Sequence, residues 1–172
     1  MLDLRLLDAG RKVEETKMAE TKLLVPLDGS ELAESALDEA LSLSHALGAE
    51  VTLLQVIALP EDLVRHGAIV ISLDEQWEVL KDRALCYLNS VRNRPEWQRT
   101  ASQVVVEMGN PAEKILDYCQ QHKIERIVMA THGRTGINRW VFGSVADKVL
   151  RAADCTVVLV RARAKQAQPS VT

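Results

Sequence analysis

Short apolar runs recur along the chain and alternate with longer amphipathic stretches. Five runs, rich in valine, leucine and isoleucine, are apolar at successive positions and so predict strands buried on both faces, at 22–28, 50–59, 102–108, 126–130 and 156–162. Between them, apolar residues spaced three and four apart predict amphipathic helices at 29–48, 74–93, 110–122 and 144–153. Strand and helix therefore alternate along most of the sequence.

Polar and turn-forming residues mark where several of these helices begin and end. Asp28 or Ser30 can cap the helix that follows the first strand, and Gly48 suits the left-handed position after its end. Asn110 is a good cap for the third helix, and Pro111 fits its first turn. Pro95 stops the second helix.

Alternating strands and helices predict an α/β fold with one doubly wound, five-stranded parallel sheet and helices on both faces, that is, a Rossmann-like architecture. Ligands of such folds bind at the carboxyl ends of strands where the strand order reverses. We expect a flexible N-terminal extension at 1–20, one domain at 21–163 and a flexible tail at 164–172.

Composition narrows the classes of function. The chain has 172 residues, 47% hydrophobic and 26% charged, as in a globular protein. A net charge of -3 gives no basic surface for nucleic acid. No apolar run approaches the roughly 20 residues that span a bilayer. We therefore expect a cytoplasmic protein that binds neither nucleic acid nor a membrane.

The three cysteines and four histidines suggest no metal centre, because they lack ligand spacing. Cys86, Cys119 and Cys155 lie far apart in the sequence. We expect them to be buried small hydrophobic residues, in preference to a disulfide or a redox pair.

Asp28 is the first candidate for a functional residue. It follows the first strand in the sequence VPLDGS, where the crevice of a doubly wound sheet opens. Asp28 could serve only to cap the first helix, or its carboxylate and the adjacent backbone could receive polar groups of a ligand. The two roles are compatible.

The second candidate is the long loop at 131–143, between the fourth strand and the last helix. Its three glycines allow a ligand to approach the backbone closely, and Arg134 and Arg139 could donate to an anion. The loop ends in Gly143-Ser144 at a helix N-terminus, which favours negative charge. Ser144 could cap the helix or donate to a phosphate oxygen. A solvated loop with ordinary capping is the alternative.

Several motifs of known enzymes are absent. The sequence has neither G-x-x-x-x-G-K-[ST] nor G-x-G-x-x-G, and LDGSELA lacks the spacing of a nucleophile elbow. His132 could act as the general base of a phosphatase or hydrolase, but nothing in the sequence pairs it with a nucleophile. It could equally lie beside a ligand or in solvent.

Three segments together resemble the universal stress protein family, in its nucleotide-binding type. They are LLVPLDGSELAESAL, GNPAEKIL and IVMATHGRTGINRWVFGSVADKVL, and the sequence AADCTVVLV at 152–160 is similar to the closing segment of the family. The resemblance extends from Lys22 to Arg161.

The family's ATP-binding signature is G-x-x-G, nine residues, then G-[ST]. Gly133, Gly143 and Ser144 match it, whereas Ala130 replaces its first glycine. On an ordinary strand backbone, alanine adds one methyl group. At a positive φ, alanine would strain the site by roughly 1 kcal/mol or more. We expect binding to be retained.

The resemblance implies a homodimeric sensor or regulator of the stress response that binds ATP or AMP, with or without Mg, dimerises through its last strand and acts on an unknown protein partner. We expect no efficient enzyme, because the sequence shows no evident water-positioning base and no dedicated magnesium ligands beyond Asp28. Slow ATP hydrolysis or autophosphorylation is the enzymatic alternative. A nucleotide-free dimeric interaction module of the same fold is the alternative. The implied nucleotide-binding residues are Pro26, Leu27, Asp28, Val56, Met129, Ala130, His132, Gly133, Gly143, Ser144, Val145 and Ala146.

Overall fold

The structure is a computed structural model of the whole chain, and it describes residues 21–58, 71–131 and 143–162. The expectations for 1–20 and 164–172, and those for His132 and Gly133, concern residues outside these ranges. The elements are β1 (Lys22–Leu27), α1 (Glu31–Glu34), α2 (Leu37–Leu47), β2 (Glu50–Ile57), α4 (Ile71–Arg92), the 3-10 helix η1 (Pro95–Trp97), β3 (Ser102–Met108), α5 (Pro111–His122), β4 (Arg126–Thr131), α6 (Ser144–Ala152) and β5 (Thr156–Arg161).

The five strands form one parallel sheet in the order β3-β2-β1-β4-β5. The chain adds strands outward from β1 in one direction and then returns to add β4 and β5 on the other side. The strand order therefore reverses between β1 and β4, which is the switch point of a doubly wound sheet. The predicted fold class is confirmed.

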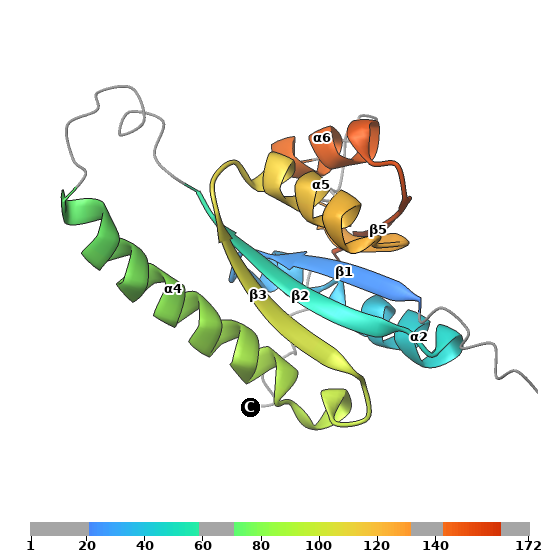
Figure 1. The fold of residues 1–172 in the computed structure, drawn as a ribbon. Coiled ribbons are helices and arrows are strands. Elements are labelled where there is room, and N and C mark those ends of the chain that lie inside the picture. The colour runs from blue at the N-terminus through green and yellow to red at the C-terminus, as the bar shows by residue number, and fades with distance from the viewer. Residues whose placement is uncertain (1–20, 59–70, 132–142, 163–172) are drawn as a thin grey trace, which may run out of the picture.

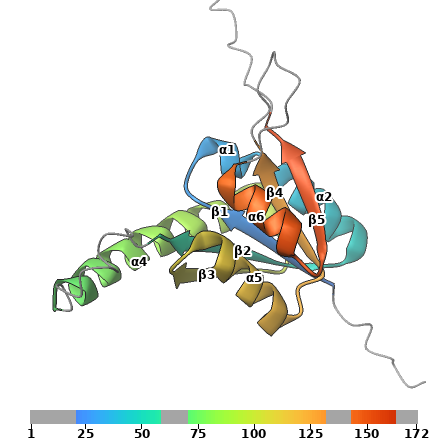
Figure 2. The same cartoon turned by 90° about the horizontal axis from the view of Figure 1, so that it is seen from above.

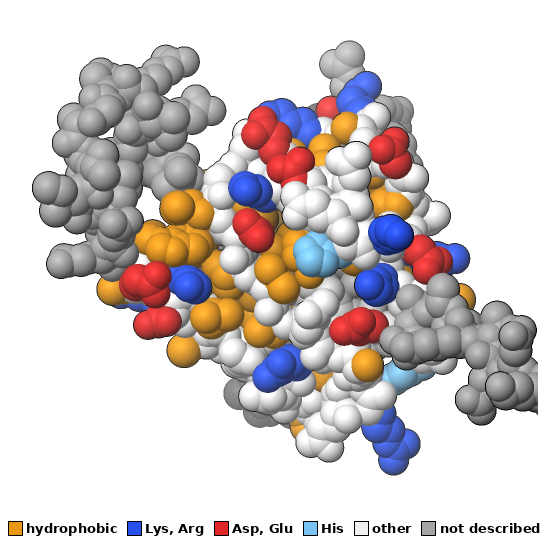
Figure 3. Space-filling model, in the orientation of Figure 1, with side chains coloured by type: hydrophobic (Ala, Val, Ile, Leu, Met, Phe, Trp, Pro, Cys, Tyr) orange, Lys and Arg blue, Asp and Glu red, His pale blue; other side chains and the backbone are white. Residues whose placement is uncertain are grey.

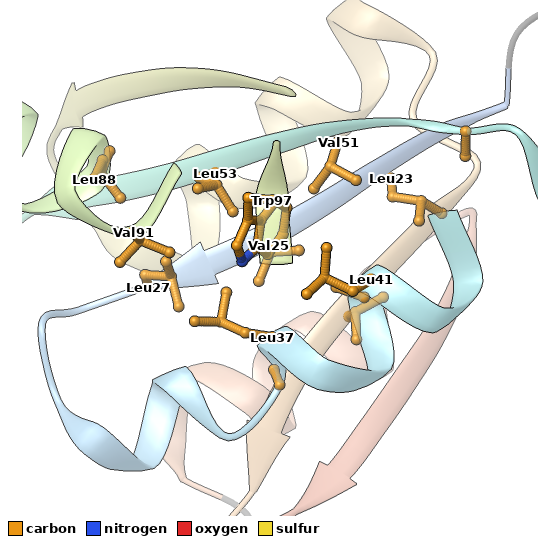
Figure 4. Close-up of a cluster of buried hydrophobic side chains, with 14 residues drawn as sticks. Leu23, Val25, Leu27, Leu37, Leu41, Val51, Leu53, Leu88, Val91 and Trp97 are labelled. Carbon is orange, nitrogen blue, oxygen red and sulfur yellow. The ribbon is translucent and has the colours of Figure 1, made fainter. Parts of the chain in front are cut away.

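Helices cover both faces of the sheet (Figures 1 and 2). On one face, α2 and α4 pack with the strands around a core that includes Leu53, Leu88 and Trp97 (Figure 4). On the other face, α5 and α6 pack against Leu24 and Ile127 and their neighbours. Because β1 and β4 are central, their side chains are buried on both faces, as the continuous apolar runs predict.

The single helix predicted at 29–48 is wrong, because the structure has two helices there, α1 and α2. The break lies at Ser35 and Ala36, whose amides donate to the carbonyls of Leu32 and Ala33, three residues earlier, over 3.1 and 3.2 Å. The Ser35 hydroxyl donates to the same Leu32 carbonyl over 2.7 Å. This competition with the regular ladder tightens the turn, while the apolar stripe continues through it.

The second predicted helix begins three residues earlier than expected, since α4 starts at Ile71 and the prediction started at 74. Its C-terminal half packs on the sheet through Ala84, Leu88 and Val91, whereas Val79 and Leu80 are exposed. Figure 1 shows why: the N-terminal half of α4 extends beyond the strands. Hydrophobic side chains gather at that end of the face in Figure 3. The other element boundaries agree with the predictions within two residues.

The predicted helix ends are confirmed where the structure describes them. Ser30 caps α1, Gly48 has φ 61° after α2, and Asn110 caps α5 with Pro111 in its first turn. Within the described ranges, no helix combines the length and the apolar character needed to cross a membrane.

Candidate functional site

A cavity of about 350 Å³ opens at the carboxyl ends of β1, β2 and β4, at the switch point of the sheet. Its volume lies within the roughly 300–1,000 Å³ of small-molecule sites. The lining is mostly aliphatic and comes from five segments of the chain: Pro26, Leu27, Asp28, Leu32, Ala33, Leu54, Val56, Ala58, Pro111, Ile115, Met129, Ala130, Gly143, Ser144, Val145 and Ala146.

Ten of the twelve site residues named from the sequence line this one cavity, and the other two, His132 and Gly133, lie outside the described residues. Sequence reasoning missed Leu54, although it lies two residues before Val56 and so faces the same side of β2. It also missed Leu32 and Ala33 of α1. Pro111 and Ile115 of α5 carried no sequence signal, because a crossover helix brings them to the cavity.

The end of β1 is held in a defined turn. Asp28 Oδ1 accepts hydrogen bonds from the Ser30 amide at 2.9 Å and from the Ser30 hydroxyl at 2.6 Å. Ser30 Oγ in turn accepts from the amide of Ala33, which caps α1. Gly29 has φ 84°, a conformation that side chains disfavour. Ser30 is thus the cap, and Asp28 orients that cap while lining the cavity.

The N-terminus of α6 forms the opposite wall. Gly143 is the N-cap residue, and among the described residues no side chain caps the helix. The first intrahelical bond runs from the Asp147 amide to the Gly143 carbonyl at 2.9 Å. The amides of Ser144, Val145 and Ala146 therefore have no acceptor within the helix, and they lie at its positive end. Ser144 occupies the first helical position, so it does not serve as the cap.

Ala130 lies on an ordinary strand backbone. It belongs to β4 and pairs with Val160 of β5. Among the described non-glycine residues, only Lys123 has a positive φ. The strain considered for this position is therefore absent, and alanine adds one methyl group to the cavity wall.

The cavity combines an apolar slot with hydrogen-bond donors at one end. Asp28 is the one ionisable side chain among its described lining residues. Across the described ranges, no three or more acidic, histidine or cysteine side chains are grouped as a metal site requires. The apolar slot suits a flat apolar group, and the amides at its end suit an anion attached to that group.

These features define a doubly wound α/β protein with a ligand cavity at its switch point. A model of the Universal stress protein family matches residues 20–161. The chain belongs to this family, as the sequence motifs indicated.

Several universal stress proteins are similar to this chain over most of its length. The universal stress protein MJ0531 of Methanocaldococcus jannaschii is 28% identical over 149 residues, which cover 84% of each chain. A universal stress protein of Methanothermobacter thermautotrophicus is 30% identical, over 81% of this chain and 94% of its own. The solved structure of protein MJ0577 is similar with a TM-score of 0.70 and 25% identity, over 84% of this chain and 98% of that one.

Two further structures of this fold contain nucleotides. A universal stress protein family member of Arabidopsis thaliana with AMP bound has a TM-score of 0.59 and 16% identity, over 87% of this chain and 97% of that one. The universal stress protein of Archaeoglobus fulgidus in complex with dAMP has a TM-score of 0.56 and 19% identity, over 83% and 98%. At these identities the likeness shows the shared fold.

Proposed function

We propose that this protein binds an adenine nucleotide, ATP or AMP, in the cavity at the switch point and acts as a sensor or regulator in a stress response. The observation that carries the proposal is a single cavity whose lining joins an apolar slot to the N-terminal amides of α6. Purine rings favour aliphatic walls, and phosphates favour helix N-termini. The AMP and dAMP complexes of proteins with this fold support the same class of ligand.

The two ends of the cavity suggest the orientation of the nucleotide. We assign the base to the β1 and β2 end, beside Pro26, Leu27, Asp28 and Val56. We assign the ribose and phosphates to the β4 and α6 end, beside Met129, Ala130, Gly143, Ser144, Val145 and Ala146, with His132 and Gly133 added by the family resemblance.

A regulatory role fits the cavity better than efficient catalysis. Rapid phosphoryl transfer needs groups that orient a nucleophile and hold Mg²⁺. Among the described lining residues, Asp28 alone carries a carboxylate that could serve either purpose. Slow ATP hydrolysis or autophosphorylation is the enzymatic alternative. Turnover that His132→Ala abolishes would favour a hydrolase.

Isothermal titration of the purified protein with ATP and with AMP tests the proposal. We expect saturable binding of at least one of them, and mass spectrometry should detect nucleotide that co-purifies with the protein. Gly143→Leu serves as the matched variant, because Gly143 has φ -58° and ψ 152°, which any residue adopts. No binding near millimolar concentration would favour the nucleotide-free interaction module.

We also propose a homodimer formed through β5. Within the described sheet, β5 pairs with β4 on one side, and its other edge is unpaired. Its four central residues, 157–160, are aliphatic and only half-buried. Exposed apolar edge strands tend to pair with another chain. Sedimentation equilibrium should show a dimer that Leu159→Lys dissociates, and a monomeric parent protein would exclude this interface.

The cytoplasm is the compartment that we propose. Cys86 is an exposed free thiol. Such thiols persist in reducing compartments. Fractionation of cells that express the tagged protein tests this location.

A further inference from the structure

Cys119 and Cys155 come from different elements and meet side by side. Cys119 lies in the last turn of α5, and Cys155 lies in the bend between α6 and β5. Both residues line one small cavity and pack in the same apolar cluster, and each is among the groups that shift the pKa of the other. The expectation that all three cysteines are buried is wrong for Cys86, which is exposed on α4, a helix that packs on the opposite face of the sheet. The chain thus has one pair of adjoining thiols and one separate thiol that can serve as an internal control.

The two thiols differ in burial and in pKa. Burial raises the pKa of Cys119 to about 12. Burial also raises the pKa of Cys155, and the neighbouring Cys119 opposes this rise. Because Cys119 is 8% exposed and Cys155 is half-buried, Cys155 is the more accessible and more readily ionised partner.

A second cavity gives small reagents access to this pair. It has a volume of about 200 Å³ between the C-terminal half of α5 and the segment from the end of α6 to Cys155, and both Cys119 and Cys155 line it. The nucleotide cavity touches the N-terminal ends of the same two helices, at Pro111 and Ser144. The two cavities therefore lie at opposite ends of one helix pair, and the thiol pair does not contact the proposed nucleotide.

We propose that Cys119 and Cys155 form a peroxide-oxidisable dithiol that closes to an intramolecular disulfide between α5 and the connection from α6 to β5. The proposal is independent of nucleotide binding. It assigns a covalent modification to residues that the nucleotide site does not use.

The chemistry balances with hydrogen peroxide as the oxidant. The Cys155 thiolate attacks one peroxide oxygen, the O–O bond breaks, and the leaving hydroxide takes up a proton to become water. Cys155 is then a sulfenic acid. Cys119 Sγ attacks the Cys155 sulfur as its thiol loses a proton, the S–S bond forms, the S–O bond breaks, and a second water leaves. The two thiols supply the two electrons that reduce the peroxide, and a dithiol such as dithiothreitol reverses the reaction by exchange.

Intact-mass and peptide measurements on the full chain carrying Cys86→Ser test the proposal. After peroxide treatment, we expect the protein to lose two hydrogen atoms in mass, to become resistant to thiol alkylation, and to give a peptide that joins Cys119 to Cys155. Dithiothreitol should restore both thiols. Thiols that stay fully alkylatable, a disulfide between two chains, or a sulfinic acid at Cys155 as the main product would overturn it.

Single variants in the same Cys86→Ser background identify the role of each sulfur. With Cys119→Ser, we expect Cys155 to stop at the sulfenic acid and to react with dimedone. Cys119→Ala, which keeps a small apolar side chain, gives the same readout if the serine variant does not fold. With Cys155→Ser, Cys119 should stay reduced at the peroxide concentration that oxidises the pair. A dimedone adduct on Cys119 and none on Cys155 would contradict the assigned order.

Discussion

Arg94 Nη2 donates a hydrogen bond to Glu34 Oε2 over 2.8 Å, and this ion pair joins α1 to the segment that follows α4. Glu34 Oε1 also accepts from the Tyr87 hydroxyl at 3.1 Å. Glu34 is adjacent in sequence to Ala33, which lines the cavity at the switch point. The network therefore ties α1, the short helix that follows Asp28, to α4. Both helices pack around the core cluster that includes Leu53, Leu88 and Trp97.

Removing either partner of this ion pair should lower stability. The Glu34 side chain is 25% exposed and that of Arg94 is 35% exposed. Each substitution therefore leaves a half-buried charged side chain without the opposite charge beside it. We expect Glu34→Ala and Arg94→Ala each to cost about 1–2 kcal/mol in urea unfolding, with a coupling energy of about 1 kcal/mol in the double variant.

The ion pair between Asp147 and Arg151 provides the control for this cycle. It lies on the surface of α6, where the Arg151 side chain is 76% exposed. Exposed pairs contribute little, so Arg151→Ala should leave the unfolding curve unchanged. Additive effects of Glu34→Ala and Arg94→Ala would show that the 2.8 Å contact carries no stability of its own.

Both tyrosines should resist ionisation in the folded protein. The chain has two, Tyr87 and Tyr118. Burial raises the pKa of each above the ordinary value of 10.0, and the neighbouring Glu34 carboxylate raises that of Tyr87 further. Because the folded state holds these protons more tightly, their contribution to stability is complete below pH 10 and is lost as the pH rises above it.

Absorbance at about 295 nm, followed against pH, measures this directly. We expect no phenolate step near pH 10 while circular dichroism reports a folded protein, and a joint rise when alkali unfolds it. The chain in concentrated denaturant should titrate near pH 10. A reversible step there with native dichroism would contradict the burial of one ring, and Tyr87→Phe would identify which.

The strands could be predicted from the sequence because burial on both faces leaves a continuous apolar run, as in β1 and β4. The break between α1 and α2 could not, since it depends on how the Ser35 hydroxyl competes for one carbonyl. The exposure of Leu80 also has no sequence signal, because the helical period is the same whether or not a sheet lies beneath it.

The candidate site was predictable where it follows strand ends and a helix start. Asp28 and Ala130 lie at the ends of strands and Ser144 at the start of a helix, and the structure places all three around one cavity. Pro111 and Ile115 reach it only through the packing of α5 on the sheet. Their place depends on a crossover whose position no local pattern specifies.

The methyl group of Ala130 should have little effect on nucleotide affinity. Because its backbone is that of an ordinary strand, Ala130→Gly relieves no strain, and we expect the dissociation constants for ATP and AMP to change less than about threefold. The glycine should instead lower stability by roughly 0.5–1 kcal/mol. Titration calorimetry with thermal unfolding checks both.

Ala130→Leu is the matched enlargement at the same position. Its side chain would occupy space in the cavity, so we expect affinity to fall about tenfold or more. A gain of tenfold or more in Ala130→Gly would instead mean that the alanine weakens the site.

Asp28 should strengthen nucleotide binding, because it is the one acidic side chain among the described residues of the cavity wall. We expect Asp28→Ala to lower nucleotide affinity about tenfold or more by removing a polar partner of the ligand and the acceptor that orients Ser30. Asp28→Asn keeps an oxygen that can accept the hydrogen bonds from Ser30, so its nucleotide affinity should lie between that of Asp28→Ala and that of the parent protein. Asp38→Asn on α2 removes the same charge at an exposed site and should leave calorimetric titrations unchanged.

Ser144→Asp should shift stability and affinity in opposite directions. A carboxylate in the first turn of α6 interacts favourably with the positive end of the helix and should add roughly 0.3–1 kcal/mol of stability. The same negative charge lies where we assign the phosphates, so it should repel them, and ATP should lose more affinity than AMP because it carries more charge there. Ser144→Ala is the neutral control. Thermal unfolding and calorimetric titration of both variants measure the two effects separately. If ATP and AMP bound Ser144→Asp as tightly as the parent protein, the phosphates would lie away from α6, and the proposed orientation of the nucleotide would be wrong.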